Sequence, residues 1–287
     1  MSIDIPVSFV DQFSANVHFL AEQKMSRLRG TVQIEDVTGE SFSIERIGGV
    51  ALNTVDERHG DTPLNSTPHT RRWGYIVDKD VADLIDKPDK VKLLINPDSA
   101  YTMRHGGALG RGFDDEIIRA LGASVNEGRN GTTTTVYDST NQSIASSSVG
   151  LTVQKLLEAK EKLDAAEVDD FIPRYLVCAA KQMTNLLGDD KVTSSDFNTV
   201  QALVQGKIDT YLGFKFIRSE RLTKVSNDRY CFAYTQNAIR LGVAQAPATI
   251  VSDRPDKRHA KQVYSYMSLG ATRAEDVQVV RVLADES

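Results

Sequence analysis

The stretch that decides the fold is GKIDTYLGFKFIRSERL, residues 206–222. A helical pattern at 195–205 precedes it, and its apolar and aromatic run at 213–219 predicts a strand. The chain therefore passes from helix to strand within a few residues. Similar changes recur along the rest of the sequence, so we predict a fold of the α+β class.

Composition places the chain among folded proteins. It has 287 residues, of which 40% are hydrophobic and 25% are charged, both near the globular average. A disordered chain would have fewer apolar residues, and two cysteines are too few for a disulfide scaffold. The net charge of −5 argues against a surface that binds nucleic acid along its whole extent. It does not exclude a protein that encloses nucleic acid without gripping it.

No membrane or secretion signal is present in the sequence. No apolar run approaches the roughly 18 residues of a membrane span. The first residues, Met1-Ser2-Ile3-Asp4, have neither a basic flank nor a continuous apolar core. We therefore expect synthesis in the cytoplasm and no membrane partner.

The first 30 residues predict an arm without a core of its own. Apolar side chains recur about every four residues, as on one helix stripe, at Phe9, Phe13, Val17 and Leu20. Such a helix has too little apolar surface to fold alone, so it needs a neighbour to lie against.

Residues 31–77 predict a long two-sided β-arm. Apolar and polar side chains alternate at 31–47, which predicts a hairpin turned at Thr38-Gly39, and a third extended run follows at 69–77. The segment 48–70 has no regular period. A loop of this length is unusual in a compact monomer and normally has a function.

Two helical patterns follow, at 78–85 and at about 98–122. Four glycines interrupt the second pattern, at Gly106, Gly107, Gly110 and Gly112. Because each costs about 1 kcal/mol in a helix interior, they predict a bend or a close backbone approach. The next residues, to 150, are rich in Gly, Ser, Thr and Asn and have room for one strand pair.

The second half of the chain predicts a helix at 151–168 and then mostly strands. The expected strands lie at 174–180, 213–219, 229–234, 249–252, 263–269 and 277–283, with helical stretches at 195–205 and 236–243. Cys178 and Cys231 lie inside apolar strand patterns, so we expect buried free thiols.

No motif predicts catalysis, a metal or a cofactor. His105 stands beside paired glycines, but the sequence has neither G-x-S-x-G nor G-x-x-x-x-G-K-[ST], and the cluster continues a helical pattern. The five histidines lack the ligand spacing of a zinc site. Acidic runs such as Asp114-Asp115-Glu116 are typical of solvated faces or caps. We therefore expect no catalytic, cofactor-binding or metal-binding residue.

The basic segment RPDKRHAK at 254–261 leaves two alternatives open. It is either a solvated turn between two strands or a loop that contacts nucleic acid or a neighbouring subunit's carboxylates. Asp256 interrupts the positive charges, which favours the turn.

The order of these parts resembles the major capsid protein of tailed double-stranded-DNA bacteriophages, the Hong Kong 97-type coat fold. The most telling stretch is 206–222, which resembles the coat-protein segment where a helix ends and a strand enters the axial domain. Further residues carry the resemblance at FSANVHFLAEQ (13–23), Ser26-Arg27-Leu28, Leu109-Gly110-Arg111 followed by Asp114, and the strands from Val263 to Leu283 with Gly270-Ala271 between them.

The resemblance implies a domain layout for the whole chain. Its parts are an N-terminal arm at 1–30, an extended loop (β-hairpin) at 31–77, a peripheral domain at 78–150 with a spine helix at about 98–122, an axial domain at 151–245, and returning strands of the peripheral domain at 246–287.

The resemblance also implies a structural function and not an enzymatic one. Hexamers and pentamers would close an icosahedral shell around the double-stranded DNA genome of a tailed phage, assembled in the host cytoplasm and present in the virion. Besides itself, its partners would be portal, scaffolding or decorating proteins. Aromatic and Arg side chains are enriched at interface hot spots, so the expected subunit-interface residues are Phe9, Phe13, Arg71, Arg72, Trp73 and Tyr75.

Three other functions remain open from the sequence. A cellular nanocompartment shell shares the fold and encloses an enzyme in place of a genome. A small-molecule enzyme of the α+β class would need a constellation assembled from distant residues. A phage tail-tube or head–tail connector protein is a third, also structural, alternative.

The extended loop generates one prediction about covalent assembly. Some coat proteins of this group join subunits by an isopeptide bond between asparagine and a lysine of this loop, and residues 29–77 contain no lysine. We therefore expect particles boiled in denaturant to run as single chains on a gel. A ladder of covalent oligomers would contradict the prediction.

Overall fold

We describe the fold from a computed structural model of the chain. The model describes residues 23–54, 58, 60–62, 64–85, 97–169, 171–188 and 210–287. The expected helix around Phe9 and Phe13 and the helical stretch at 195–205 lie outside these residues.

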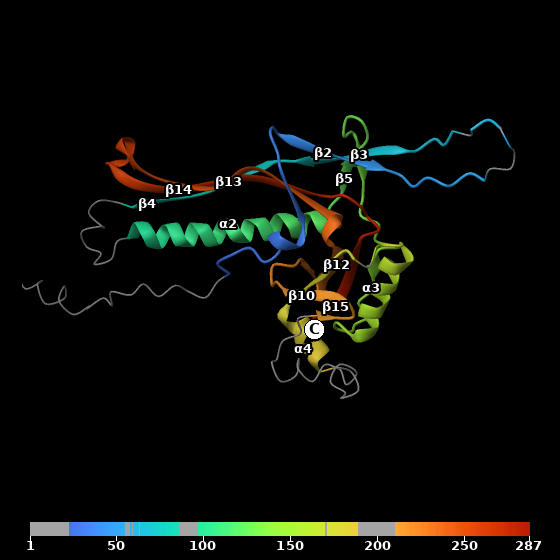
Figure 1. The fold of residues 1–287 in the computed structure, drawn as a ribbon. Coiled ribbons are helices and arrows are strands. Elements are labelled where there is room, and N and C mark those ends of the chain that lie inside the picture. The colour runs from blue at the N-terminus through green and yellow to red at the C-terminus, as the bar shows by residue number, and fades with distance from the viewer. Residues whose placement is uncertain are drawn as a thin grey trace, which may run out of the picture. The chain divides into compact units, whose positions relative to one another are not determined.

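Helices and strands mix along the chain, which confirms the predicted α+β class (Figure 1). The helices are η2 (Arg29–Thr31), α2 (Pro97–Gly122), α3 (Val153–Ala165), α4 (Ala180–Leu187), η3 (Gln236–Ala238) and η4 (Pro255–Lys257). The strands are β1 (Gln33–Asp36), β2 (Ser41–Ile47), β3 (His69–Tyr75), β4 (Val77–Ile85), β5 (Val125–Glu127), β6 (Thr133–Thr135), β7 (Ser143–Ile144), β8 (Arg174–Cys178), β9 (Thr210–Tyr211), β10 (Phe214–Arg218), β11 (Lys224–Val225), β12 (Asp228–Thr235), β13 (Ile239–Arg254), β14 (Ala260–Arg273) and β15 (Val279–Asp285).

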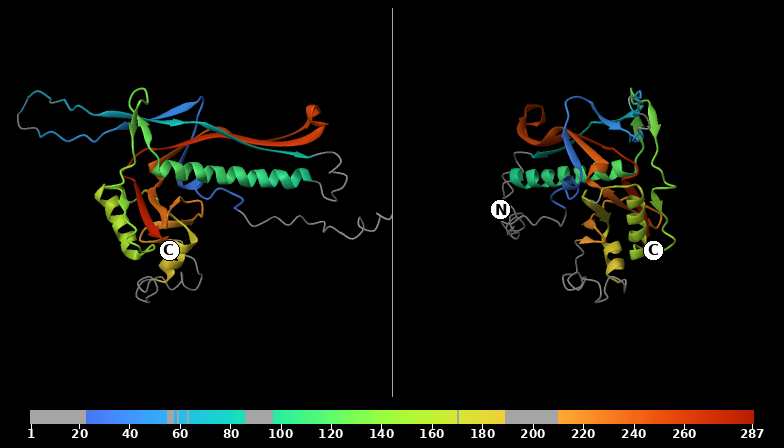
Figure 2. Two further views of the ribbon diagram at one scale, coloured as in Figure 1. Left: turned by 180° about the vertical axis from the view of Figure 1, so that it is seen from behind. Right: turned by 45° about the vertical axis from the view of Figure 1, so that its right-hand side comes forward.

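The described strands form three sheets (Figure 2). A seven-stranded sheet has the order β7-β15-β12-β8-β10-β9, with β11 paired to β12. The two four-stranded sheets have the orders β1-β13-β14-β4 and β2-β3-β5-β6. The chain divides into two compact units, one of 1–26, 78–113 and 245–268 and one of 27–77, 114–244 and 269–287.

The predicted hairpin at 31–47 is wrong, because its two strands join different sheets. β1 pairs in parallel with β13, whereas β2 pairs antiparallel with β3, from Ser41 opposite Tyr75 to Ile47 opposite His69. Alternation shows that a segment is a strand, but it does not show which strand is its partner. Phe42 of β2 packs where glycines leave room, against Gly74 and Gly242.

Two predicted helices are strands. Residues 78–85 lie in β4, where exposed and partly buried residues alternate, and only η3 is helical within 236–243, because β13 begins at Ile239. Both segments are short, and short segments are ambiguous between the two periods. Both segments form strands because they pair with strands far away in the sequence.

The predicted close backbone approach in the long helix is confirmed. α2 is assigned as one helix, and a Cβ atom on Gly110 would lie 3.1 Å from the backbone nitrogen of Ser26 and 3.2 Å from Cα of Met25. A Cβ on Gly112 would lie 2.5 Å from Cε of Met267. Glycine at these positions lets other segments lie directly against the helix backbone.

The predictions for the second half hold in most places. α3 lies within 151–168, begins at the N-cap Thr152, and the strand pair expected before residue 150 is β5 with β6. Cys178 and Cys231 are buried free thiols, as predicted, and burial raises the pKa of Cys178 to about 12. The returning strands at 246–287 do not lie in one sheet, however. β15 pairs with β12 and β7 in the seven-stranded sheet and not with β14.

The packing at Gly270 generates a prediction about stability. A Cβ atom there would lie 2.0 Å from the carbonyl oxygen of Tyr75, which is backbone and cannot rotate away. We expect Gly270→Ala to lower the free energy of unfolding by about 1–3 kcal/mol, the usual cost of overpacking. Thermal unfolding of the purified variant measures the change.

Gly49→Ala is the matched control, because no atom lies within 4 Å of a Cβ at Gly49. It should stay within about 0.5 kcal/mol of the parent protein. Equal melting temperatures for both variants would show that the approach at Gly270 is not tight in solution.

Candidate subunit interface

Strands β2 and β3 form the base of a long arm, which the sequence predicts as a site of contact between subunits. Pairing ends where the Gly48 backbone N–H donates to the Pro68 carbonyl at 2.9 Å. Beyond this point the loop exposes large apolar side chains, with Leu52 100% and Leu64 95% exposed. Figure 1 shows the two strands of the arm leading into this loop. The irregular sequence of the loop does not single out these leucines as contact residues, and Leu52 directly follows Val50 and Ala51.

Three of the predicted interface residues lie on one face of β3. The guanidinium carbon of Arg71 lies 5.6 Å from the centre of the Trp73 ring, and Arg71 also donates to Glu45 of β2. Trp73 Nε1 donates to the carbonyl of Gly128 at 2.9 Å. Tyr75 is 47% exposed. This face keeps an aromatic and cationic surface in contact with solvent.

Arg72 points to the opposite face and is 1% exposed. Its Nε donates to Glu127 at 2.5 Å, and its two terminal nitrogens donate to Asp276 at 3.2 and 2.5 Å. It also donates to the carbonyl of Arg273 at 3.1 Å. The guanidinium is therefore used inside its own chain, and we withdraw Arg72 from the predicted interface.

The two carboxylates around Arg72 are held in their charged form. Burial raises the pKa of Glu127 and Asp276, but hydrogen bonds from arginine outweigh it, so both pKa values are lowered. Glu127 also accepts from Thr135 at 2.8 Å and from Arg46 at 3.0 Å. Removing Arg72 would leave the partly buried negative charge of Glu127 and Asp276 less fully compensated.

Arg273 extends this network to the end of α2. Its side chain is fully buried, and Nε donates to Asp276 at 2.6 Å. One terminal nitrogen donates to the carbonyls of Leu121 at 3.2 Å and Ala123 at 2.8 Å. The last carbonyls of a helix have no partner within it, and a cation there also opposes the helix dipole. Arg273 therefore caps α2 and ties its end to Asp276.

A second network joins segments that carry the resemblance quoted above. The buried carboxylate of Asp114 accepts from the backbone N–H groups of Arg27 at 3.1 Å and Leu28 at 3.0 Å. Arg27 donates to the carbonyl of Arg218 at 2.6 Å, and Arg221 pairs with Asp115. The start of the described chain, the middle of α2 and the end of β10 therefore meet through these bonds.

The sequence predicts a solvated face or a cap at 114–116, and the solvated face is wrong for two of these residues. Asp114 is 0% exposed and Glu116 is 3% exposed, and Glu116 accepts from Arg119. Buried carboxylates persist when hydrogen-bond donors surround them, as the backbone of Arg27 and Leu28 does here.

A model of the phage capsid protein family matches residues 5–286, almost the whole chain. The chain belongs to the phage capsid protein family. The family match favours a structural phage capsid protein over the alternatives of a small-molecule enzyme, a nanocompartment shell and a tail or connector protein. The comparison with curated proteins gave no match.

Solved structures share the fold of this capsid protein over nearly the whole chain. The cyanophage P-SCSP1u capsid is 14% identical, with a TM-score of 0.75, covering 97% of this chain and 94% of that one. The capsid of cyanophage Pam1 is 16% identical, with a TM-score of 0.73 and coverage of 98% and 97%. The acid-stable capsid of Helicobacter pylori bacteriophage KHP30 is 10% identical, with a TM-score of 0.75 and coverage of 100% and 98%. The predicted Hong Kong 97-type coat fold is confirmed.

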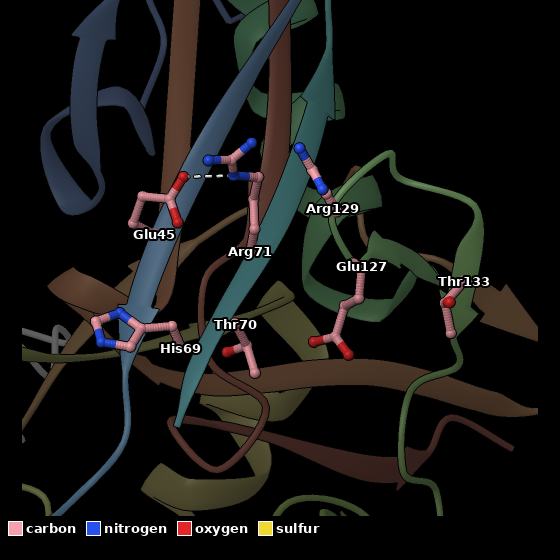
Figure 3. Close-up of a pocket in the computed structure, with 8 residues that line it drawn as sticks. Glu45, His69, Thr70, Arg71, Glu127, Arg129 and Thr133 are labelled. Atoms are coloured by element: carbon pink, nitrogen blue, oxygen red, sulfur yellow. Dashed lines mark hydrogen bonds and ion pairs between the residues drawn. The ribbon is translucent and has the colours of Figure 1, made fainter. Parts of the chain in front are cut away.

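An open pocket lies beside the exposed face of β3 in the capsid protein. Figure 3 shows Glu45 and Arg71 bonded to each other at one side of it, with Arg129 and Glu127 from the β5–β6 hairpin at the other. Its charged lining residues are the carboxylates of Glu45 and Glu127 and the guanidinium groups of Arg71 and Arg129, so it can bind a polar or charged segment.

His105 lies in a buried polar cluster of the capsid protein. Its Nε2 is 2.8 Å from Asp83 and its Nδ1 is 3.1 Å from the hydroxyl of Ser265, which also bonds to Thr249 at 2.8 Å. The order of partners is that of a Ser-His-Asp triad, but His105 and Ser265 are 2% and 0% exposed. Substrate has no access to this hydroxyl in the structure, and the cluster joins α2 to β4, β13 and β14.

The described part of the chain contains no candidate metal site and no candidate membrane-spanning helix. No group of three His, Cys, Asp or Glu residues in it could hold a metal ion. No helix in it is long and apolar enough to cross a membrane. Of the expected interface residues, Phe9 and Phe13 lie outside the described residues, and Arg71, Trp73 and Tyr75 remain as candidates.

The Arg72 network generates a prediction about stability and pH. Arg72→Gln should lower the free energy of unfolding by about 3 kcal/mol at pH 7, the low end for breaking a buried ion pair. We choose the low end because Glu127 and Asp276 retain side-chain exposures of 22% and 25%. Arg71→Gln is the matched control, because an exposed pair contributes less than about 1 kcal/mol.

The difference between parent and Arg72→Gln should depend on pH. Because the folded pKa values of Glu127 and Asp276 lie below their unfolded values, their stabilisation is complete above the unfolded pKa, about 4. It is lost as the pH falls through the folded values. Thermal unfolding should therefore show a gap that is widest at pH 7 and narrows toward pH 3. A gap independent of pH would contradict the assignment.

Proposed function

We propose that this capsid protein assembles as hexamers and pentamers into an icosahedral shell that encloses the double-stranded DNA genome of a tailed phage. The arm formed by β2, β3 and the loop between them carries the proposal. Its exposed leucines at 52 and 64 are an unfavourable surface for a monomer, and a neighbouring subunit that covers them removes this cost. The family match supports a shell as the product of assembly.

The base of the arm is held firmly enough to support contacts with a neighbouring subunit. The Arg72 network joins β3 to β5 and to the segment after β14 through charged hydrogen bonds, which are stronger than neutral ones. Among the described residues of the loop, Asn65 donates to the Ala51 carbonyl at 2.8 Å and accepts from the Asn53 side chain at 2.9 Å. A firmly held base with a separate loop suits a clasp over an adjacent subunit.

The charge of the chain suits a container for DNA. Each phosphate contact adds affinity that depends on salt and slows the movement of packaged DNA. A net charge of −5 keeps such contacts few. We assign no catalytic step and no cofactor to the protein, and the enclosed DNA is held without sequence-specific binding.

The proposed layout follows the sheets. The seven-stranded sheet with α3 and α4 forms most of the axial domain, to which we add β15. The unit with β4, the first part of α2 and the β13–β14 hairpin forms part of the peripheral domain. Portal, scaffolding and decorating proteins are the further partners we propose. The assembled protein would lie in the virion after assembly in the host cytoplasm.

Electron microscopy and light scattering of the purified protein test self-assembly. We expect closed shells or isolated five-fold and six-fold rings. A monomer at every concentration, with and without a crowding agent, would contradict the proposal.

An arm-shortened variant tests the role assigned to the loop. Replacing residues 49–67 by Asn-Gly closes the hairpin at the bonded pair of Gly48 and Pro68 with a favoured two-residue turn. We expect an unchanged melting temperature and loss of shells. Leu52→Ser with Leu64→Ser, which keeps the length of the loop, should weaken assembly less than the deletion does. Normal shells from the shortened protein would exclude the arm as a clasp.

A further inference from the structure

The outer face of the β4–β14 strand pair carries an acidic and aromatic pocket. The rings of Tyr264 and Tyr266 stack with their centres 5.5 Å apart and their planes at 21°. Next to them the carboxylate of Asp78 accepts from the Ser268 hydroxyl at 2.5 Å. The pocket is lined by Asp78, Lys79, Asp80, Tyr264, Tyr266, Met267 and Ser268.

Negative charge dominates this pocket in spite of Lys79. Partial burial, the charge of Asp80 and a hydrogen bond to Asp80 raise the pKa of Tyr264, and the charge of Asp78 adds to the effect. Two carboxylates therefore lie beside two aromatic faces. This is the environment that a guanidinium or ammonium group prefers, because carboxylates pair with it and ring faces attract it.

A basic turn lies in the same unit, at the far end of the β13–β14 hairpin. Lys257, Arg258 and His259 are exposed there. Arg254 is engaged with Asp256 at 2.8 Å and with Gln262 at 2.7 Å, so the charges of Lys257 and Arg258 dominate the end of the turn. The predicted turn between two strands is confirmed. The second alternative for this segment, contact with a neighbouring subunit, is still to be tested.

The backbone of the turn is strained at its basic residues. Arg258 and His259 have φ values of 52° and 57°, in the left-handed region that usually belongs to Asn and Gly. Side chains with a Cβ are disfavoured there, because the Cβ comes too close to the following carbonyl oxygen. Asn or Gly would fit this backbone with less strain, so the conformation of the turn does not account for the basic residues.

A chain cannot place its own turn in its own pocket. Tyr264 follows Arg258 by six residues along the extended β14, which corresponds to about 20 Å of strand. The hairpin would have to fold back on itself to bring them together. A contact between turn and pocket must therefore join two copies, and it joins different surfaces of each, as the contacts that build closed rings do.

We propose that Lys257 and Arg258 of one copy dock in the Tyr264–Tyr266 pocket of a second copy, where they face Asp78 and Asp80. The inference rests on the proposed self-assembly and names one contact within it. Both partners of the contact are exposed and charged, so it should weaken as salt concentration rises.

Charge exchange tests the contact. Lys257→Glu with Arg258→Glu should shift the protein from assembled to unassembled fractions in sedimentation, and so should Asp78→Lys with Asp80→Lys. All four substitutions together should restore assembly. Asp253→Lys on the same hairpin is the control, because it changes the charge of an exposed residue away from the pocket and should assemble normally. If the fourfold variant does not restore assembly, the proposal is wrong. Binding of DNA by the turn would then be the alternative to test.

Disulfide cross-linking tests the contact without requiring closed shells. Arg258→Cys and Tyr266→Cys proteins, mixed and oxidised, should give a dimer on a non-reducing gel that neither gives alone. The native thiols are both buried and should not contribute. Thermal unfolding of each variant shows whether it is folded. If the parent protein assembles but no mixed dimer forms, the docking contact is wrong and the proposed function stands; if the parent protein fails to assemble, the function itself is wrong.

Discussion

The buried guanidinium of Arg72 is the interaction on which the larger unit depends. It brings together β3, β5 and the segment between β14 and β15 by donating to Glu127, Asp276 and the Arg273 carbonyl. Arg273 then passes the same connection to the end of α2. Such a network gains little over an apolar core, but losing Arg72 is costly, because it removes donors from two partly buried carboxylates at once. Glu127 would keep Arg46 and Thr135 as donors, and Asp276 would keep Arg273. The base of the arm is therefore held by this charged network together with the apolar cluster of Phe42, Ile44 and Ala274.

The same strand serves two purposes because side chains alternate across it. Arg72 faces inward, whereas Arg71, Trp73 and Tyr75 lie on the other face, where Arg71 lines the open pocket of Figure 3. Two adjacent arginines thus have unrelated roles, one in folding and one in contacts with another molecule. The basic turn and the tyrosine pair of the other unit repeat this division, since Ser265 lies inside with His105 while Tyr264 and Tyr266 lie outside.

Local patterns in the sequence were sufficient for much of the fold. The long helix, the helix after residue 150 and most strands follow from period and composition, and the glycines of α2 correctly indicated a close approach at Gly110. The failures concern partners. Nothing near residues 33–36 indicates that they pair with β13, and nothing near Arg72 indicates that Asp276, 204 residues away, makes it an internal residue. Asp114 appeared solvated for the same reason, because its donors are the backbone of Arg27 and Leu28.

The alternation along β3 also bears on how such proteins diverge. A change at Arg72 must be accompanied by changes at two carboxylates far away in the sequence, so that position should drift slowly. The neighbouring Arg71 contacts Glu45 and Trp73 within its own chain and is otherwise constrained by whatever lies against the outer face. Two lineages can therefore keep one fold while their outer faces become incompatible. In a cell infected by both, their subunits would fold side by side and still sort into separate shells.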